Sequence, residues 1–119
     1  MFIKKNKYYI YIENLSSINL NRVKNRSKFN LIYRNNIKKE KLSEIIAFQK
    51  LCKKKNIKFF VANDLSKALR LNASGIYLSS YNKKFLNISK TLRKNFEIIG
   101  SAHNFSEINM KRKQGCETV

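Results

Sequence analysis

Several polar side chains that could do chemistry come directly after short apolar runs of this sequence. Arg34, the only aspartate, Asp64, and the only histidine, His103, are the most informative of them. Arginine suits phosphate or pyrophosphate, because its planar guanidinium donates two parallel hydrogen bonds. One carboxylate with phosphate oxygens can hold Mg²⁺, and histidine can transfer protons near neutral pH. Further candidates at equivalent places are Asn63, Ser79, Ser80, Asn82, Ser101 and Asn104.

Each of these residues also has a purely structural interpretation. Asp64 is placed to cap the helix expected after it, and His103 to be a loop histidine with a satisfied hydrogen bond. Arg34 is placed to pair with Glu40 or to face solvent. The functional interpretation is favoured by their shared position, because chemistry in parallel α/β folds collects at the carboxyl ends of the strands.

The elements that must position these residues are read from the hydrophobic periodicity. Short, nearly continuous apolar runs alternate with helical patterns, which is typical of a parallel sheet covered by helices. The best helix covers about 39–55, where apolar side chains recur every three to four residues. Strands are expected at 7–12, 29–33, 57–62, 75–79 and 97–101, with another beginning at 116–119; further helices are expected at 64–71, 88–94 and 105–113, with a weak one within 16–27.

Two α/β architectures fit this alternation, a doubly wound sheet and part of a (β/α)8 TIM barrel. A doubly wound nucleotide-binding sheet needs a glycine-rich turn after its first strand, and residues 13–16 contain no glycine. The sequence therefore favours a partial barrel of five to six parallel strands with helices outside. A whole barrel takes about 200 to 250 residues. The 119 residues are expected to form one domain, 1–119, an N-terminal portion truncated near strand six.

The charge balance invites a different function, because 26 Lys and Arg against 7 Asp and Glu give a net charge of +19. Clustered cations such as Lys53–Lys55 could bind a nucleic acid. Lysine outnumbers arginine about three to one, however, and Lys, Asn, Ile, Phe and Tyr are all encoded by A/T-rich codons. Codon bias therefore explains the excess of lysine without a nucleic-acid partner. A basic module that binds RNA or another polyanion remains the alternative function of a different class.

The cysteines and the apolar runs bear on location. Cys52 and Cys116 are far apart in the sequence, which fits a reducing compartment and argues against a disulfide scaffold or a zinc site. No apolar run approaches the roughly 18 residues that cross a bilayer, and residues 1–7 lack the features of a signal peptide. A cytoplasmic protein without membrane contact is expected.

An ordered series of short motifs gives the sequence a family resemblance. Asn63-Asp64, the run 68–78, the run 98–104 and Gly115 together resemble the thiamine phosphate synthase / thiazole tautomerase family. The resemblance runs from about Tyr8 to Val119. It implies a (β/α)8 barrel and a transferase of thiamine biosynthesis. Such an enzyme joins hydroxymethylpyrimidine pyrophosphate to thiazole phosphate and releases pyrophosphate with the help of Mg²⁺.

The resemblance also implies roles for single residues. Arg34 would contact the pyrophosphate, Asn63 the pyrimidine or the pyrophosphate, Asp64 would bind Mg²⁺, and Ser101 would assist at the reacting centre. Departure of pyrophosphate leaves an electron-poor pyrimidinyl cation, so positive charge near the leaving group favours the reaction.

The sequence departs from the family pattern at three other positions. Asn36 stands where the synthases have a lysine that helps to bind pyrophosphate, and Asn82 stands where they have a second Mg²⁺-binding aspartate. Ile32 replaces a glutamine. These changes weaken pyrophosphate and metal binding, and the family's later glycine-rich phosphate loops lie beyond the strands of this chain. A fragment inactive on its own is therefore expected.

Two further expectations follow from the same resemblance. In the tautomerase branch a histidine after strand five shuttles protons, and His103 occupies that place, so an isomerase that uses His103 remains an alternative. A partial barrel has open sheet edges, which makes self-association possible.

Overall fold

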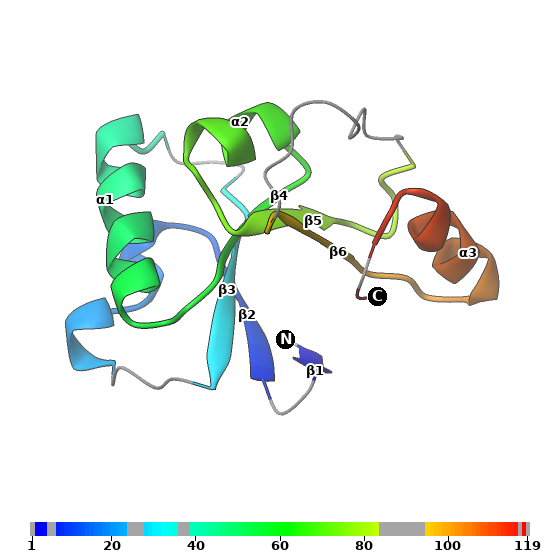
Figure 1. Cartoon of the computed structure of the whole chain (residues 1–119), viewed down its shortest axis with the longest axis horizontal. Helices are drawn as coiled ribbons and strands as arrows, with labels where there is room; N and C mark the ends of the chain where they lie inside the picture. Colours follow the sequence, from blue (N-terminus) through cyan, green and yellow to red (C-terminus); the bar gives the residue numbers. More distant parts are fainter. Residues whose placement is uncertain are drawn as a thin grey trace.

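The computed structural model describes residues 2–4, 7–23, 28–35, 39–83, 95–116 and 118, and a single six-stranded sheet forms its centre (Figure 1). The strands are neighbours in sequence order. The first pairs antiparallel with the second, and the other pairs are parallel. The strands are β1 (Phe2–Lys4), β2 (Lys7–Ile12), β3 (Phe29–Tyr33), β4 (Phe59–Ala62), β5 (Gly75–Leu78) and β6 (Glu97–Gly100).

The strand order confirms the predicted partial barrel. A doubly wound sheet reverses direction at a switch point, whereas β2 to β6 add one after another on the same side, as barrel strands do. A parallel bridge between Ile99 and Thr118 continues the series beyond β6, where a further strand was predicted to begin. The antiparallel β1 was not predicted.

The described helices agree with the prediction for three segments. They are α1 (Leu42–Lys54), α2 (Leu65–Arg70) and α3 (Phe105–Lys113), and Figure 1 shows them in succession around the sheet. The basic run at the end of α1 includes Lys53 and Lys54 in its last turn, where cations suit the helix dipole. The helix predicted at 88–94 lies outside the described residues.

The weak helix predicted within 16–27 is wrong in its described part. Two 3₁₀ turns, Leu15–Ser17 and Leu20–Arg22, stand there instead, and residues 24–27 lie outside the described part. Asn14 and Asn19 explain the difference, because both side chains bond to nearby groups. The Oδ1 of Asn14 accepts from the Ser16 hydroxyl, and the Oδ1 of Asn19 accepts from the Asn21 amide. Such local bonds compete with a helix.

The sheet separates two apolar clusters, because side chains alternate between its faces. The larger cluster lies between the strands and the helices and includes Tyr33, Phe59 and Cys52. The smaller cluster lines the other face, which is the interior face of a barrel. It consists of Tyr9, Ile32, Phe60, Tyr77 and Ile99, with Tyr11 and Ala62 packed against it.

The buried thiol of Cys52 is expected to make the protein less stable at alkaline pH. Cys52 is fully buried on α1, and burial raises its pKa from 9.0 to about 12. The unfolded thiol therefore ionises first, and the protein loses stability as the pH rises above about 9, by up to about 1.4 kcal/mol per pH unit from this group. In Cys52→Ala we expect a lower but flatter stability curve between pH 8 and 10.5, measured by urea unfolding. Parallel curves for the parent and the variant would contradict the prediction.

Candidate functional site

The carboxyl ends of the parallel strands form one rim of the sheet, and backbone hydrogen bonds extend across it. The amide of Arg34 donates to the carbonyl of Ile12 over 2.9 Å, and the amide of Asn63 donates to that of Tyr77 over 2.7 Å. The amide of Ser101 donates to the carbonyl of Leu78 over 3.0 Å. The predicted residues after β3, β4 and β6 are thus set at one edge by the parallel register.

Arg34 lies over two interior aromatic rings. Its guanidinium carbon is 4.9 Å from the ring centroid of Tyr11 and 6.0 Å from that of Tyr77. Glu40, its alternative partner, instead accepts hydrogen bonds from the Tyr33 hydroxyl and from the backbone amide of Leu15. A cation held by aromatic faces keeps its positive charge available for an anion.

A directed chain of hydroxyl groups runs below Arg34 to Ser101. The Tyr77 hydroxyl donates to the Ser101 Oγ over 2.8 Å, and the hydroxyls of Tyr11 and Tyr77 are 3.1 Å apart. Because Tyr77 has one proton, Tyr11 must donate to Tyr77. Burial raises the pKa of Tyr11, and the bond to Tyr77 adds to the rise. The Ser101 proton is then free to donate to a further group.

Asn63 joins the end of β4 to the loop after β5. Its backbone is left-handed, with φ of 61°, a conformation that asparagine tolerates better than most residues. The side-chain Oδ1 accepts from the Ser79 amide over 2.9 Å and from the Asn82 Nδ2 over 3.0 Å. The Nδ2 donates to the Ser79 Oγ over 2.7 Å and to the Tyr81 hydroxyl over 3.3 Å. Two predicted site residues, Asn63 and Asn82, are therefore in direct contact.

Asp64 caps α2, which confirms the structural part of its interpretation. The Oδ1 of Asp64 accepts from the Lys67 amide over 3.0 Å, and the residue is exposed. The carboxylate has a second oxygen, which the cap does not use. The prediction that Asp64 binds Mg²⁺ stays a prediction.

A cavity of about 190 Å³ lies between the ends of β3 and β4, and it brings three of the predicted site residues together. Its walls include Arg34, Asn63 and Asp64, together with Asn35 and Lys67. It is smaller than the usual pocket for a drug-sized molecule. Sequence reasoning missed Lys67, which looks like any other surface lysine of a short helix. Asn36, predicted to bind substrate, lies outside the described residues.

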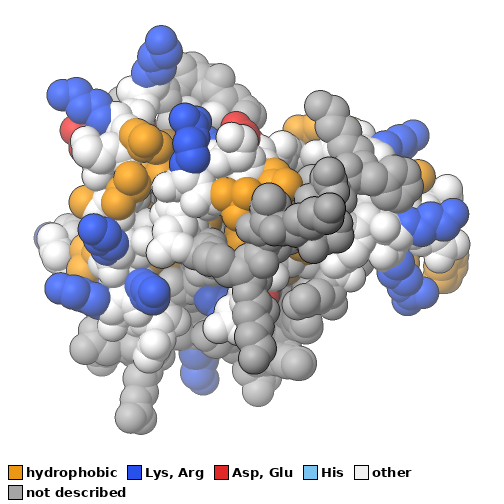
Figure 2. Space-filling view, turned by 45° about the horizontal axis from the view of Figure 1, so that its top comes forward, with side chains coloured by type: hydrophobic (Ala, Val, Ile, Leu, Met, Phe, Trp, Pro, Cys, Tyr) orange, Lys and Arg blue, Asp and Glu red, His pale blue; other side chains and the backbone are white. Residues whose placement is uncertain are grey.

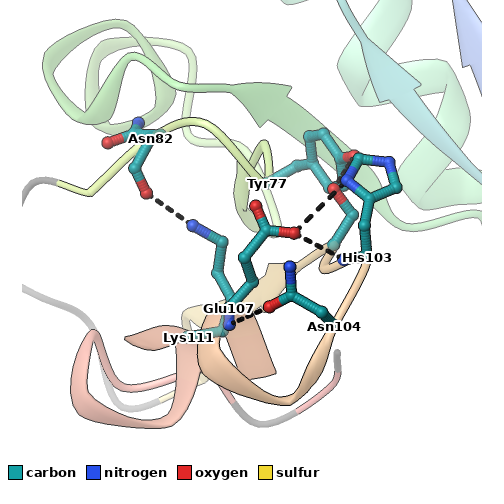
Figure 3. A network of polar contacts seen from close by, with 7 residues as sticks. Tyr77, Asn82, His103, Asn104, Glu107 and Lys111 are labelled. Atoms are coloured by element: carbon teal, nitrogen blue, oxygen red, sulfur yellow. Dashed lines mark hydrogen bonds and ion pairs between the residues drawn. The ribbon is translucent and has the colours of Figure 1, made fainter. Parts of the chain in front are cut away.

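The loop that carries Asn82 is tied to α3 by a buried lysine, and Figure 3 shows the contact. The Lys111 Nζ donates to the carbonyl oxygen of Asn82 and, over 2.8 Å, to the Oε1 of Gln114. The Nε2 of Gln114 donates to the same carbonyl over 2.9 Å. Burial lowers the pKa of Lys111, while Cys116 and Glu107 act in the opposite direction. Lys111 and Gln114 thus fix the position of the Asn82 backbone.

His103 lies at the start of α3, and its contacts are those of a helix terminus. Its imidazole is largely exposed, and the Nδ1 is 3.3 Å from the Oε1 of Glu107. The same oxygen accepts from the His103 amide over 2.7 Å, and the Oδ1 of Asn104 accepts from the Glu107 amide over 2.9 Å (Figure 3). This reciprocal arrangement resembles a capping box. His103 is not among the residues that line the cavity.

Three other predicted features depend on the surface and the side chains: a polyanion partner, a metal ion and the absence of membrane contact. On the face in Figure 2 the blue Lys and Arg side chains are dispersed and form no single continuous patch. In the described part of the chain, no three His, Cys, Asp or Glu side chains gather to hold a metal ion. The same part contains no helix that is long and apolar enough to span a membrane.

A family model, a curated protein and a solved structure that resemble this chain all come from one protein family. A family model described as thiamine monophosphate synthase matches residues 8–119. A thiamine-phosphate synthase of Prochlorococcus marinus subsp. pastoris is 39% identical over 82 residues, which are 68% of this chain and 23% of that protein. The solved thiamine phosphate pyrophosphorylase of Pyrococcus furiosus shares the fold, with a TM-score of 0.60 at 18% identity over 95% of this chain and 58% of that one.

Proposed function

This chain belongs to the thiamine monophosphate synthase family, and on that basis we propose that its cavity between β3 and β4 binds the diphosphate of hydroxymethylpyrimidine pyrophosphate. In the proposed reaction the pyrimidinyl group passes to thiazole phosphate and diphosphate leaves. The chain spans about a quarter of the curated relative, 23%, and 58% of the solved one. The described strands would form one sector of the barrel that carries out this reaction.

One observation carries the proposal: Arg34 and Asp64 line the same small cavity at the carboxyl ends of the strands. Arg34 can bind two oxygens of a diphosphate, while the rings of Tyr11 and Tyr77 hold its guanidinium in place. Breaking the bond between the pyrimidinyl carbon and the diphosphate leaves negative charge on the diphosphate. Arg34 would stabilise that charge where it develops.

Ser101 supports the same chemistry from β6. Its hydroxyl accepts from Tyr77 and keeps its own proton, so it can donate to an oxygen of the substrate. The Tyr11–Tyr77 chain would hold that hydroxyl in one orientation. Asn63 is engaged by the loop after β5, and its proposed contribution is to shape the cavity wall beside Asp64.

The donor groups fit Mg²⁺ only together with substrate. Asp64 offers one carboxylate oxygen beyond its cap, and Mg²⁺ usually combines one or two carboxylates with phosphate oxygens and water. We propose Asp64 as the ligand and the side-chain oxygen of Asn82 as a neutral second one. When bound, Mg²⁺ would neutralise part of the charge on the leaving diphosphate.

Replacing Asp64 by asparagine separates its cap from its proposed metal role. Asparagine caps helices as well as aspartate does, so the stability of Asp64→Asn should match that of the parent chain. We expect its affinity for inorganic pyrophosphate to lose its Mg²⁺ dependence, measured by calorimetric titration with and without Mg²⁺. In a full-length enzyme with the whole barrel, Mg²⁺-dependent turnover should fall far more in Asp64→Ala than in Ser79→Ala.

The control for this test is stability. Asp64→Ala should lose about 1 kcal/mol of folding free energy as well as the Mg²⁺ effect, because alanine cannot cap α2. If Asp64→Asn retains the full Mg²⁺ dependence, Asp64 is only a cap, and the proposed metal site is wrong. Binding of pyrophosphate by neither the parent chain nor any variant would count against the proposed function itself.

No observation of comparable weight supports the two alternatives, an isomerase that uses His103 and a polyanion-binding module. The isomerase alternative depends on His103, whose described contacts are with Glu107 at the start of α3. The polyanion-binding alternative depends on gathered cations, and those in Figure 2 are dispersed over the face shown.

A further inference from the structure

We propose that Lys67 is a second anion-binding cation of this cavity and that Arg34 and Lys67 together select a diphosphate over a monophosphate. The inference rests on the proposed function and adds to it a residue that determines specificity. Lys67 stands in the first turn of α2, lines the cavity with Arg34, and is half-buried there.

The position of Lys67 is fixed from two sides. Its backbone amide donates to Asp64 Oδ1, which holds the first turn of α2 against the cavity. Its Nζ lies 5.2 Å from the ring centroid of Tyr33, so the side chain is directed toward the end of β3. An ammonium is attracted to the face of an aromatic ring, which favours this placement of the side chain.

The two cations approach the cavity from opposite faces of the sheet. Tyr33, under Lys67, belongs to the cluster between the sheet and the helices, whereas Tyr77, under Arg34, belongs to the interior cluster. Both line one cavity at the ends of β3 and β4. Two cations that enter from different sides offer two separate anion contacts, which is the arrangement that two linked phosphoryl groups need.

The charge balance points to the same ligand. Within the described residues, neither Arg34 nor Lys67 is in an ion pair; the pairs found are Lys58 with Glu97 and His103 with Glu107. The cavity therefore has two cations against the single carboxylate of Asp64. One phosphate group carries about −1.5 to −2 at pH 7 and a diphosphate carries more, so the second cation matters most for the diphosphate.

The test compares pyrophosphate with inorganic phosphate in calorimetric titrations at about 0.15 M salt and fixed Mg²⁺. Lys67→Met keeps the apolar stem on Tyr33 and removes the ammonium. We expect its affinity for pyrophosphate to fall about tenfold and its affinity for phosphate to change less than twofold. Lys67→Arg should retain the preference for pyrophosphate.

Arg70→Met is the matched control, because Arg70 is an exposed cation of the same helix that does not line the cavity. Removing a cation that does not line the cavity should leave the binding of both anions as it is in the parent chain. If pyrophosphate binding is lost in Arg34→Ala but unchanged in Lys67→Met, this inference is wrong and the proposed function stands. Equal losses for both anions in Lys67→Met also overturn it. Absence of pyrophosphate binding in the parent chain overturns both.

Discussion

Replacing Arg34 by alanine is expected to lower the affinity for Mg²⁺-pyrophosphate by about a hundredfold. The guanidinium is the one group of the cavity that can donate two parallel bonds to the ligand, and the loss of such a donor commonly reduces binding or turnover by factors of this order. Calorimetric titration with pyrophosphate, and turnover with both substrates where it is detectable, measure the effect.

Stability distinguishes a binding role for Arg34 from a structural one. The stacking of Arg34 on Tyr11 and Tyr77 is worth about 0.5–1 kcal/mol, so Arg34→Ala should remain folded with only slightly lower resistance to urea. Arg34→Lys keeps the charge without the planar fork and should bind with intermediate affinity. Arg22, an exposed arginine outside the cavity, supplies the control Arg22→Ala, which should bind as the parent does. Unchanged affinity in Arg34→Ala would remove Arg34 from the site.

Replacing Gly75 by alanine is expected to prevent stable folding, with a loss above about 3 kcal/mol. A Cβ at this position would lie 2.0 Å from the carbonyl oxygen of Glu97 and 2.8 Å from its carbonyl carbon. Gly75 and Glu97 are paired in the parallel ladder of β5 and β6, so relieving the clash requires the two strands to separate. Urea unfolding followed by circular dichroism, or the loss of soluble protein, reports the effect.

Gly100 provides a comparison of the same residue type on the neighbouring strand. A Cβ there would meet the Cys116 Sγ and the Lys111 Cδ, each at 2.8 Å. Both are side-chain atoms, and the nearest backbone atom, the carbonyl oxygen of Leu78, would be 3.2 Å away, so the clash with the backbone is milder than at Gly75. Gly100→Ala should therefore be destabilised less than Gly75→Ala. An equal or smaller effect for Gly75→Ala would show that β5 and β6 tolerate a separation that their pairing does not suggest.

The strand predictions succeeded where a run is buried on both faces. Within the predicted runs 57–62 and 75–79, the strands Phe59–Ala62 and Gly75–Leu78 carry no charged side chain, because the helices cover one face and the barrel interior the other. Phe2–Lys4 is too short to show any periodicity, and its strand exists through pairing with β2. In the segment 16–23, Leu20 and Val23 have a helical spacing, but the side chains of Asn14 and Asn19 stabilise turns instead.

The candidate site was predictable in part, for a geometric reason. Parallel strands end at the same edge, so the position of a residue after its strand predicted that Arg34, Asn63 and Asp64 would share one rim, and there they line one cavity. Residue type alone does not tell which lysines are special. Lys67 lines the cavity and Lys111 is fully buried, yet both belong to short helices with other lysines or arginines. Only tertiary contacts distinguish them.

The antiparallel β1 covers the edge of β2 with which another strand could otherwise pair. Its residues Phe2, Ile3 and Lys4 pair with β2 from Lys7 to Tyr9, on the side away from β3. A closed barrel brings its last strand to that side of its first parallel strand, and a backbone edge can accept only one partner at a time. A strand that arrives there, from this chain or another, must displace β1 or pair only with the half of β2 from Ile10 to Ile12. Another strand can therefore pair with the whole of β2 only when β1 is detached from it.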